Sequence, residues 1–298
     1  MHRRLFKKES KTDIALLIFA YAVLSLALVV TLYPLLYVVS ASFSSSSEVA
    51  SGRMWLFPRD FNVEGYRVVF ENSSLLRGFF NSAFYAASTT ILSLFSMMSA
   101  GFALSRKELP GKSAIVIYLV ITMFFSGGLI PTYLVIMKLG MINTRWALIL
   151  PGCVGVSNIV VARTFINSTI SESLFDAAKT DGSGYLWFFA RVVLPLSKPV
   201  MAVYALYTIV AVWGSYFSAL LYLQDNNLMP LQVYLRKILV MNTFELDQVG
   251  SESFVRMKQV YGIMKYALIV VSTVPIMCIY PFIQKYFVKG IMVGSLKG

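Results

Sequence analysis

Residues 172–195 read ESLFDAAKTDGSGYLWFFARVVLP and form a polar island between long apolar stretches. The island opens with the acidic residues Glu172 and Asp176, and Asp181-Gly182 divides it in two. Acidic side chains stabilise the N-terminus of a helix, and a glycine in the left-handed conformation commonly ends one. The segment therefore predicts a short helix, a tight turn at Gly182 and a second helix.

The first helix is predicted from Glu172 to Lys179, with Ser171 or Thr169 as its N-cap. The second helix contains an aromatic run and must stop near Pro195, because proline cannot continue the hydrogen-bond ladder of a helix. A helix–turn–helix of this size that projects from a membrane is suited to docking in a cleft of another protein.

The spacing of these residues resembles the EAA loop of ABC importer permeases, which reads E-A-A-x-x-D-G-A and, further on, I-x-L-P. The matching runs here are Asp176-Ala177-Ala178, Asp181-Gly182-Ser183 and Val193-Leu194-Pro195. Two positions depart conservatively, because Asp176 stands for Glu and Ser183 for Ala. In that family the loop engages the ATPase, so the resemblance implies that residues 167–198 are a coupling loop. The residues that it implies in ATPase coupling are Glu172, Asp176, Ala177, Ala178, Asp181, Gly182 and Ser183.

The composition places the chain among integral membrane proteins. Of its 298 residues, 57% are hydrophobic and only 13% are charged, against about 25% charged residues in soluble domains. Six apolar runs are long enough to span a bilayer, and each must be helical because lipid cannot hydrogen-bond to open backbone groups. These runs lie at 14–40, 79–104, 114–137, 147–166, 199–223 and 262–288.

The sequence thus predicts an all-α integral membrane protein with six transmembrane helices. The resemblance implies the type I ABC importer permease fold with a cytoplasmic coupling helix. The first apolar run is too long, and too poor in a small-residue cleavage site, for a removed signal peptide. It is therefore expected to remain as a span.

Basic residues predict the orientation, because cytoplasmic segments are enriched in Lys and Arg. The segments on one side carry 15 basic and 6 acidic residues, and those on the other side carry 11 and 8. The more basic side holds the N-terminal tail, the 105–113 loop, the coupling loop and the C-terminus. Both termini are therefore expected to be cytoplasmic, in a multi-pass protein of the bacterial cell membrane. The net charge of +12 follows mostly from this topology and requires no nucleic acid.

The chain is predicted to be one membrane domain, residues 14–298, after a basic cytoplasmic tail at 1–13. Two long external loops are expected, at 41–78 and 224–262. The first begins with a serine run, which is typical of a loop. It continues with aromatic residues that suggest a segment packed on the bilayer surface, namely Trp55, Phe57 and Tyr66.

Further motifs are similar to those of the maltose-type carbohydrate permeases. The runs that carry this resemblance are Asn81-Ser82, Ala103–Arg106, Gly127–Tyr133 and Trp213–Tyr216. That family often has Asn after the Trp, and Gly214 stands here instead, so any role of that Asn does not carry over. The C-terminal run Lys265-Tyr266-Ala267, Pro275, Tyr280-Pro281-Phe282 and Gln284–Phe287 resembles the Lpl-type branch, which is associated with uptake of complex polysaccharides and oligosaccharides.

No catalytic or cofactor site is predicted. Pro110-Gly111-Lys112-Ser113 superficially resembles a phosphate loop, but Arg106 occupies the position of the required earlier glycine and no strand precedes it. ATP and Mg are therefore expected on separate ATPase subunits. Cys153 and Cys278 lie in predicted spans, and the lone His2 lies in the basic tail, so neither a disulfide framework nor a His-based metal site is indicated.

A sugar path needs polar and aromatic side chains that face a cavity, because aromatic faces stack on pyranose rings. Asn158 is the foremost candidate, since an amide at mid-span is costly unless it is hydrogen-bonded. The other path candidates are Trp213, Tyr216, Tyr133, Ser126 and Tyr207, with Thr122, Ser157, Tyr204 and Ser215 as further polar positions. Each could instead serve helix packing or interface anchoring. The small-residue stripe from Ser93 to Gly101 is expected to be a packing face.

The function predicted is that of a transmembrane permease subunit of an ATP-driven ABC importer. Its substrate is expected to be a carbohydrate, an oligosaccharide that could contain uronate, moved by alternating access. The resemblance implies a homologous second permease, two cytoplasmic ATPase subunits and an extracytoplasmic solute-binding protein as partners. Alternatives are an ABC permease for a peptide or amino acid, a stand-alone secondary transporter or channel, and a membrane structural protein. The middles of the spans lack ionisable groups, which disfavours proton coupling but leaves sodium coupling open.

Overall fold

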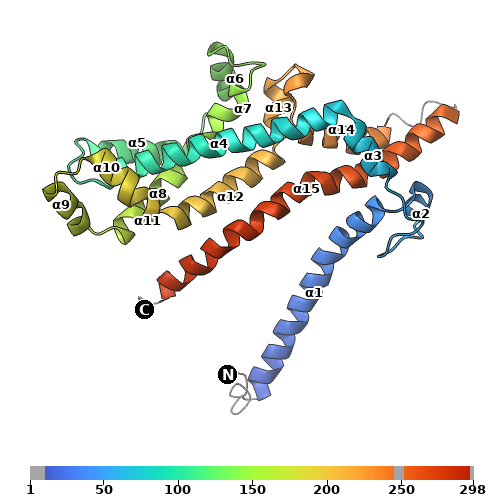
Figure 1. Cartoon of the computed structure of the whole chain (residues 1–298), viewed down its shortest axis with the longest axis horizontal. Helices are drawn as coiled ribbons and strands as arrows, with labels where there is room; N and C mark the ends of the chain where they lie inside the picture. Colours follow the sequence, from blue (N-terminus) through green and yellow to red (C-terminus); the bar gives the residue numbers. More distant parts are fainter. Residues whose placement is uncertain (1–10, 245–251, 296–298) are drawn as a thin grey trace. The chain divides into compact units, whose positions relative to one another are not determined.

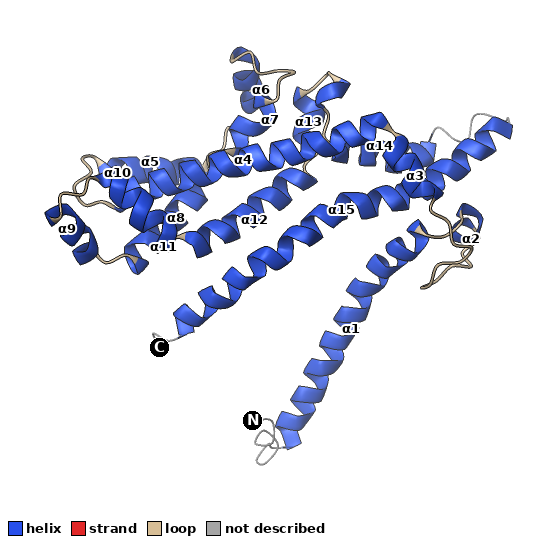
Figure 2. Ribbon diagram, in the orientation of Figure 1, coloured by secondary structure: helices blue, strands red, loops and turns tan. Residues whose placement is uncertain are grey.

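A computed structural model describes residues 11–244 and 252–295. Within these ranges the secondary structure is helical, and no strand occurs (Figures 1 and 2). The long helices are α1 (Lys11–Ser42), α4 (Ser73–Ser105), α5 (Lys112–Phe124), α8 (Val156–Thr169), α12 (Lys198–Gly214), α14 (Leu231–Phe244) and α15 (Glu252–Ser295). The shorter ones are α2 (Ser46–Ala50), α3 (Glu64–Glu71), α6 (Leu129–Lys138), α7 (Trp146–Ile149), η1 (Leu150–Gly152), α9 (Glu172–Thr180), α10 (Tyr185–Phe188), η2 (Phe189–Val193), α11 (Leu194–Leu196), α13 (Phe217–Tyr222) and η3 (Asn226–Leu228).

Three single helices are long and apolar enough to cross a membrane: Thr12–Ser42, Ser73–Ser105 and Met264–Phe282. Three bent helix pairs meet the same requirement, so the described residues hold up to six spans. The all-α fold class is confirmed, and the six-span count agrees with it. The segment Ser73–Ser105 begins earlier than the predicted 79–104, because the Asn72 side chain caps the helix by accepting hydrogen bonds from the amides of Ser74 and Leu75.

The spans predicted at 114–137, 147–166 and 199–223 contain helix breaks that the sequence analysis did not predict. The first bends by 117° between α5 and α6, and the second bends by 42° between η1 and α8. The fifth span consists of the pair Tyr185–Leu196 and Lys198–Gly214, which meet at 75°. The predicted range continues past the end of α12 into α13, because apolar composition alone does not mark the break at Ser215-Tyr216.

The chain divides into two compact units, which share α14 and α15. Unit 1 comprises Met1–Glu71 and Ile238–Val271, and unit 2 comprises Asn72–Lys237 and Ser272–Gly298. The single membrane domain 14–298 and the sidedness of the external loops stay predictions. The predicted loop 224–262 contains α14 and the start of α15, and the loop 41–78 contains α2 and α3.

The core of unit 2 lies where α4 packs against α8 and α12. Gly101 permits the close approach of α4 to α8, because a Cβ at this position would lie 2.7 Å from the Cβ of Ala162. Ser93 is buried on the same helix, and the Ser96 hydroxyl donates to the Cys153 carbonyl. The predicted packing face of α4 is confirmed at these positions, as small residues at helix contacts allow.

Candidate functional site

The predicted coupling loop contains α9, which has the predicted helix and turn. The amide of Ser183 donates to the Ala178 carbonyl at 2.9 Å, and that of Gly182 donates to the Lys179 carbonyl at 3.0 Å. These two bonds form a Schellman motif, which needs a left-handed residue after the helix. Gly182 has φ +79°, so its predicted conformation is confirmed.

The N-terminus of α9 differs from the prediction in one detail. Ser171 holds the N-cap position, but its side chain makes no capping hydrogen bond. Its Oγ lies 3.0 Å from that of Ser173 instead. The helix also continues one residue further than predicted, to Thr180.

The second half of the loop is helical through α10, η2 and α11, and it ends at Leu196. Pro195 lies inside the last helical turn, so the helix ends one residue after the proline that was expected to stop it. The turn before it, η2, is a π-helix. Proline has no N–H for the carbonyl four residues earlier, and a wider turn accommodates that missing hydrogen bond.

Phe175 anchors α9 to the rest of unit 2. Its side chain is only 4% exposed and belongs to an apolar cluster that α4, α8 and α10 share. The Phe175 ring meets the Phe188 ring edge-on, with centroids 5.1 Å apart, and the Tyr185 ring at 5.2 Å. Burial of a phenylalanine contributes about 1.5–3 kcal/mol. The helix is therefore packed firmly on the bundle.

Two basic residues at the end of α4 also hold α9. The Arg106 guanidinium lies over the Phe102 ring at 5.1 Å and over the Phe175 ring at 4.9 Å. Lys107 forms an ion pair with Glu172 on the first turn of α9. The hydrogen bond from Lys107 to Glu172, and the charge of Glu172, raise the pKa of the Lys107 ammonium. The Lys107 ammonium therefore stays charged at neutral pH.

The opposite face of α9 is open. Asp176, Ala177 and Gly182 are exposed, whereas Ala178 is half-buried against the apolar cluster. A Cβ on Gly182 would meet no atom of the described chain within 4 Å. Large apolar side chains are also exposed along the loop, namely Leu174, Tyr185, Leu186 and Trp187. The loop thus combines a buried anchor with an apolar and acidic outer face, which is the arrangement of a docking element.

Comparison with known proteins decides the family. Residues 113–293 match the family described as the binding-protein-dependent transport system inner membrane component. The chain belongs to this family of permeases. It is 35% identical to protein LplC of Bacillus subtilis, over 90% of each chain. It is 37% identical to the polygalacturonan/rhamnogalacturonan transport system permease protein YtcP of the same organism, over 93% of this chain and 96% of the relative.

A solved structure agrees with these relatives. The crystal structure of a bacterial ABC transporter involved in the import of the acidic polysaccharide alginate is 30% identical and has a TM-score of 0.86. The match covers 94% of this permease and 99% of that chain. The permease is therefore a multi-pass bacterial membrane protein of an ABC importer, and a separate subunit hydrolyses ATP. This result decides against a stand-alone transporter and a purely structural membrane protein.

Three of the predicted path residues have contacts within the described part of unit 2. Trp213 is buried, and its indole N–H donates to the Ser272 carbonyl at 2.8 Å. The guanidinium of Arg236 lies 4.8 Å from the Tyr216 ring, and Tyr133 stacks on Tyr222 at 6.1 Å. These contacts give the three aromatic residues packing partners within unit 2. Tyr207 and Ser126 are exposed, and their place in the path stays a prediction.

Asn158 has the arrangement expected of a binding group. It is half-buried on the first turn of α8, next to the bend at Gly155. A Cβ on Gly155 would lie 2.7 Å from the Asn158 amide nitrogen, so the glycine leaves room for this side chain. Within the part of the permease that the structure describes, the Asn158 side chain has no hydrogen-bond partner. Its amide is free for a ligand hydroxyl.

A cavity of about 390 Å³ in unit 2 contains Ser215, which the sequence predicted as a polar path position, and five polar residues that were not among the predicted path residues. Its polar lining comes from Ser82, Tyr85, Thr132, Ser215, Ser218 and Tyr222. Pro151 and Gly152 line it at one helix break, and Ser215 lies at another. Proline, glycine and serine at these helix breaks were the sequence signal that could have indicated the cavity.

Proposed function

We propose that the permease imports an oligosaccharide that contains uronate residues. Support comes from two proteins similar along nearly the whole chain, since one is named for polygalacturonan/rhamnogalacturonan transport and the other imports the acidic polysaccharide alginate. A peptide or amino acid as substrate finds no support among these relatives. The permease itself holds no cofactor in this proposal, and ATP and Mg bind to the ATPase subunits.

The proposed assembly pairs this chain with a homologous second permease. Two cytoplasmic ATPase subunits and an extracytoplasmic solute-binding protein complete it. Both termini and the coupling loop lie in the cytoplasm, as the distribution of Lys and Arg indicates. The open face of α9 then points toward an ATPase subunit.

The anchor at Phe175 supports a mechanism for coupling. When ATP closes the ATPase dimer, α9 moves as a rigid lever with its exposed face held in the partner cleft. Phe175 and Arg106 pass this movement to α4, because both contact Phe102 or its neighbours in the apolar cluster. The spans reopen outward to accept sugar, and release of ADP and phosphate reverses the change.

The proposed sugar path includes Asn158, whose unpaired amide can accept or donate a hydrogen bond to a hydroxyl. Trp213, Tyr216, Tyr133, Ser126 and Tyr207 remain path candidates, together with the cavity that Tyr85 and Ser215 line. Aromatic residues that are packed in one state of the cycle become available for stacking only if the helices separate in another.

Uptake of labelled oligogalacturonate by cells that depend on this permease tests the proposal. Uptake should exceed that of a neutral oligosaccharide or a peptide of equal length. Asn158→Leu should lower uptake roughly tenfold, which corresponds to loss of one hydrogen bond. Thr164→Leu, at an exposed position of the same helix and outside the coupling loop, is the matched control and should have no effect. Equal uptake of all three compounds, or normal uptake by Asn158→Leu, would contradict the substrate class or the path, respectively.

A further inference from the structure

Residues 51–63, here called the aromatic loop, expose a cluster of aromatic side chains next to the end of α1. Trp55, Phe57 and Phe61 are 74%, 77% and 72% exposed, and Val63 is also exposed. Exposed aromatic clusters of this kind mark contact with a partner or a membrane.

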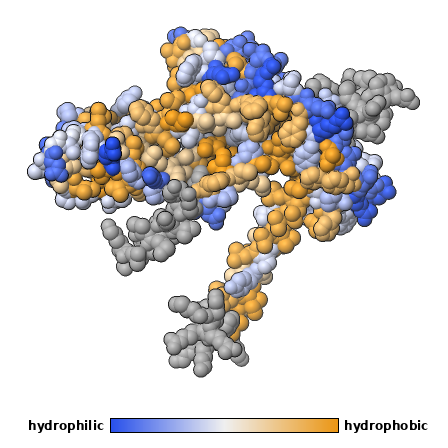
Figure 3. Space-filling model, in the orientation of Figure 1, coloured by the Kyte–Doolittle hydropathy of each residue, from blue (hydrophilic) through white to orange (hydrophobic). Residues whose placement is uncertain are grey.

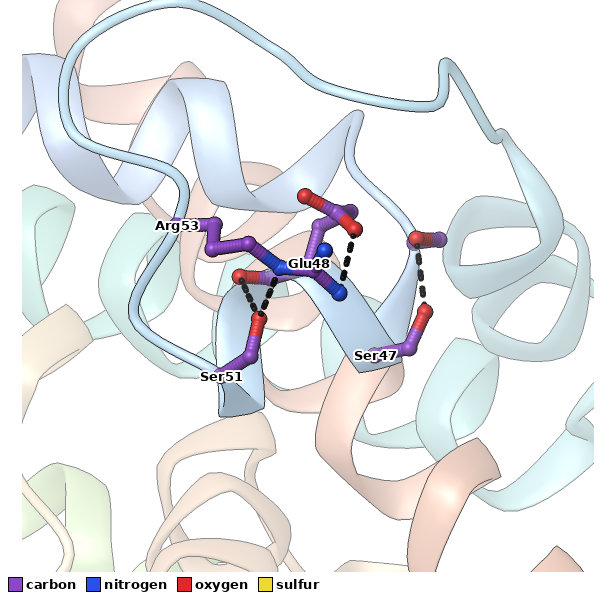
Figure 4. Close-up of polar contacts among 5 residues, drawn as sticks. Ser47, Glu48, Ser51 and Arg53 are labelled. Carbon is purple, nitrogen blue, oxygen red and sulfur yellow. Dashed lines mark hydrogen bonds and ion pairs between the residues drawn. The ribbon is translucent and has the colours of Figure 1, made fainter.

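The beginning of the aromatic loop is fixed by polar contacts (Figure 4). Arg53 forms an ion pair with Glu48 at 3.0 Å, and its Nε donates to the Ser51 hydroxyl at 3.0 Å. Ser45 and Ser47 make a further hydroxyl contact at 3.2 Å on the adjoining turn. The indole N–H of Trp55 donates to the Gly52 carbonyl at 3.2 Å. The Trp55 ring is therefore exposed, although its indole N–H already has a hydrogen-bond acceptor.

The far end of the aromatic loop is fixed as well. Phe61 forms a backbone bridge with Ser44, and its ring stacks on that of Phe43 at 5.6 Å. The amide of Asn62 donates to the Phe43 carbonyl at 2.9 Å. Because both ends are held, the aromatic side chains are presented by a defined backbone and not by a loose chain.

One hydrogen bond sets the depth of the aromatic loop relative to the membrane. The Ser40 hydroxyl donates to the Leu56 carbonyl at 2.5 Å. Ser40 lies in the last turn of α1, at the end of the candidate span Thr12–Ser42, whose apolar 18-residue stretch is not buried by the rest of the described chain. Most of the visible face of this helix is apolar, with a paler band near its middle (Figure 3). Leu56 and its neighbours therefore lie where the hydrocarbon ends and the headgroups begin.

The charge of the aromatic loop also fits the headgroup region of the membrane. Arg59 is exposed and forms no ion pair with any described residue. It lies between Phe57 and Phe61 in the sequence, so the aromatic loop carries an exposed guanidinium among its aromatic residues. Aromatic rings with adjacent basic groups are typical of membrane interfaces, where rings enter the boundary and cations pair with phosphates.

We propose that the aromatic loop is an interfacial anchor that inserts Trp55 and Phe57 into the outer leaflet and pairs Arg59 with lipid phosphate. The assignment to the outer leaflet rests on the proposed orientation. Lipid fits better than a docked protein, because Ser40 ties the loop to the end of a candidate membrane span and so holds it at headgroup depth.

Photo-crosslinking in intact cells tests the anchor in the assembled transporter. Phe57 is replaced by p-benzoylphenylalanine, and adducts are separated by mass. A phospholipid adduct is expected at this position. The same photo-reactive residue at Phe19, an exposed position in the middle of α1, is the matched positive control for lipid contact. The test does not depend on transport, so its failure leaves the proposed substrate untouched.

Three other outcomes would overturn the anchor. A larger band that contains the solute-binding protein would assign the loop to protein docking, and one that contains the second permease would assign it to a subunit interface. Absence of any adduct at Phe57 while Phe19 yields a lipid adduct would place the ring in water. Labelling of introduced cysteines from outside the cell shows separately on which side of the membrane the loop lies. A lipid adduct at a loop that lies on the inner side would contradict the proposed orientation but not the lipid contact.

Discussion

At the scale of single residues, Phe175 and Gly182 have opposite places in the coupling loop. Phe175 is buried in the apolar cluster of unit 2, whereas a Cβ on Gly182 would meet no described atom within 4 Å. The glycine turn was predictable, because a left-handed residue after a short helix depends on local chemistry. The contacts of Phe175 with Arg106 were not, because they join residues 69 positions apart.

The stack of Arg106 on Phe175 gives a prediction at this scale. Arg106→Gln and Phe175→Leu should each destabilise the loop by about 1 kcal/mol or more, since a cation–π contact contributes about 0.5–2 kcal/mol. The double variant should lose less than the sum, because both changes remove the same contact. Thermal unfolding and the ratio of ATP hydrolysed to substrate moved measure the two effects. Strict additivity would show that the residues act independently.

At the scale of elements, the helix breaks are where the sequence was least informative. The six runs of apolar residues overlap the three single candidate spans and the three bent helix pairs, because span length follows from bilayer thickness. Their bends depend on a few backbone conformations and on contacts that composition does not report. Gly127-Gly128 was visible as a motif, yet nothing in it indicated a bend of 117°. Trp213 was predicted to line the path because aromatic faces stack on sugar rings. Its hydrogen bond to the Ser272 carbonyl, 59 positions away, could not be predicted from the sequence.

Gly128 is the residue that the break between α5 and α6 requires. Its φ of +83° and ψ of −175° lie in a region that is essentially restricted to glycine. Gly128→Ala should therefore destabilise the permease by about 1–3 kcal/mol. Gly127→Ala is the control, because its new Cβ would meet only Pro131, at 3.4 Å. Equal melting temperatures for the two variants would contradict a strained break.

At the scale of the whole molecule, the account depends on which ends of the helices face the cytoplasm. A cysteine at Ser183 should be protected from an impermeant thiol reagent added to intact cells, and one at the exposed Ser47 should react. The background must lack Cys278, which is exposed. Permeabilised cells provide the control, because both positions should then react. Labelling of Ser183 from outside would reverse the orientation.

Gly182→Trp tests the central claim, that the 172–183 segment couples the permease to its ATPase. Gly140→Trp is the matched control, since Gly140 has a similar φ of +66° and the same open space. Both variants therefore carry equal backbone strain and no clash within the described chain. The measurement is recovery of the ATPase subunit with the purified permease, alongside substrate uptake. Gly182→Trp should lose both and Gly140→Trp should keep both. Full ATPase recovery and uptake by Gly182→Trp would contradict the coupling role.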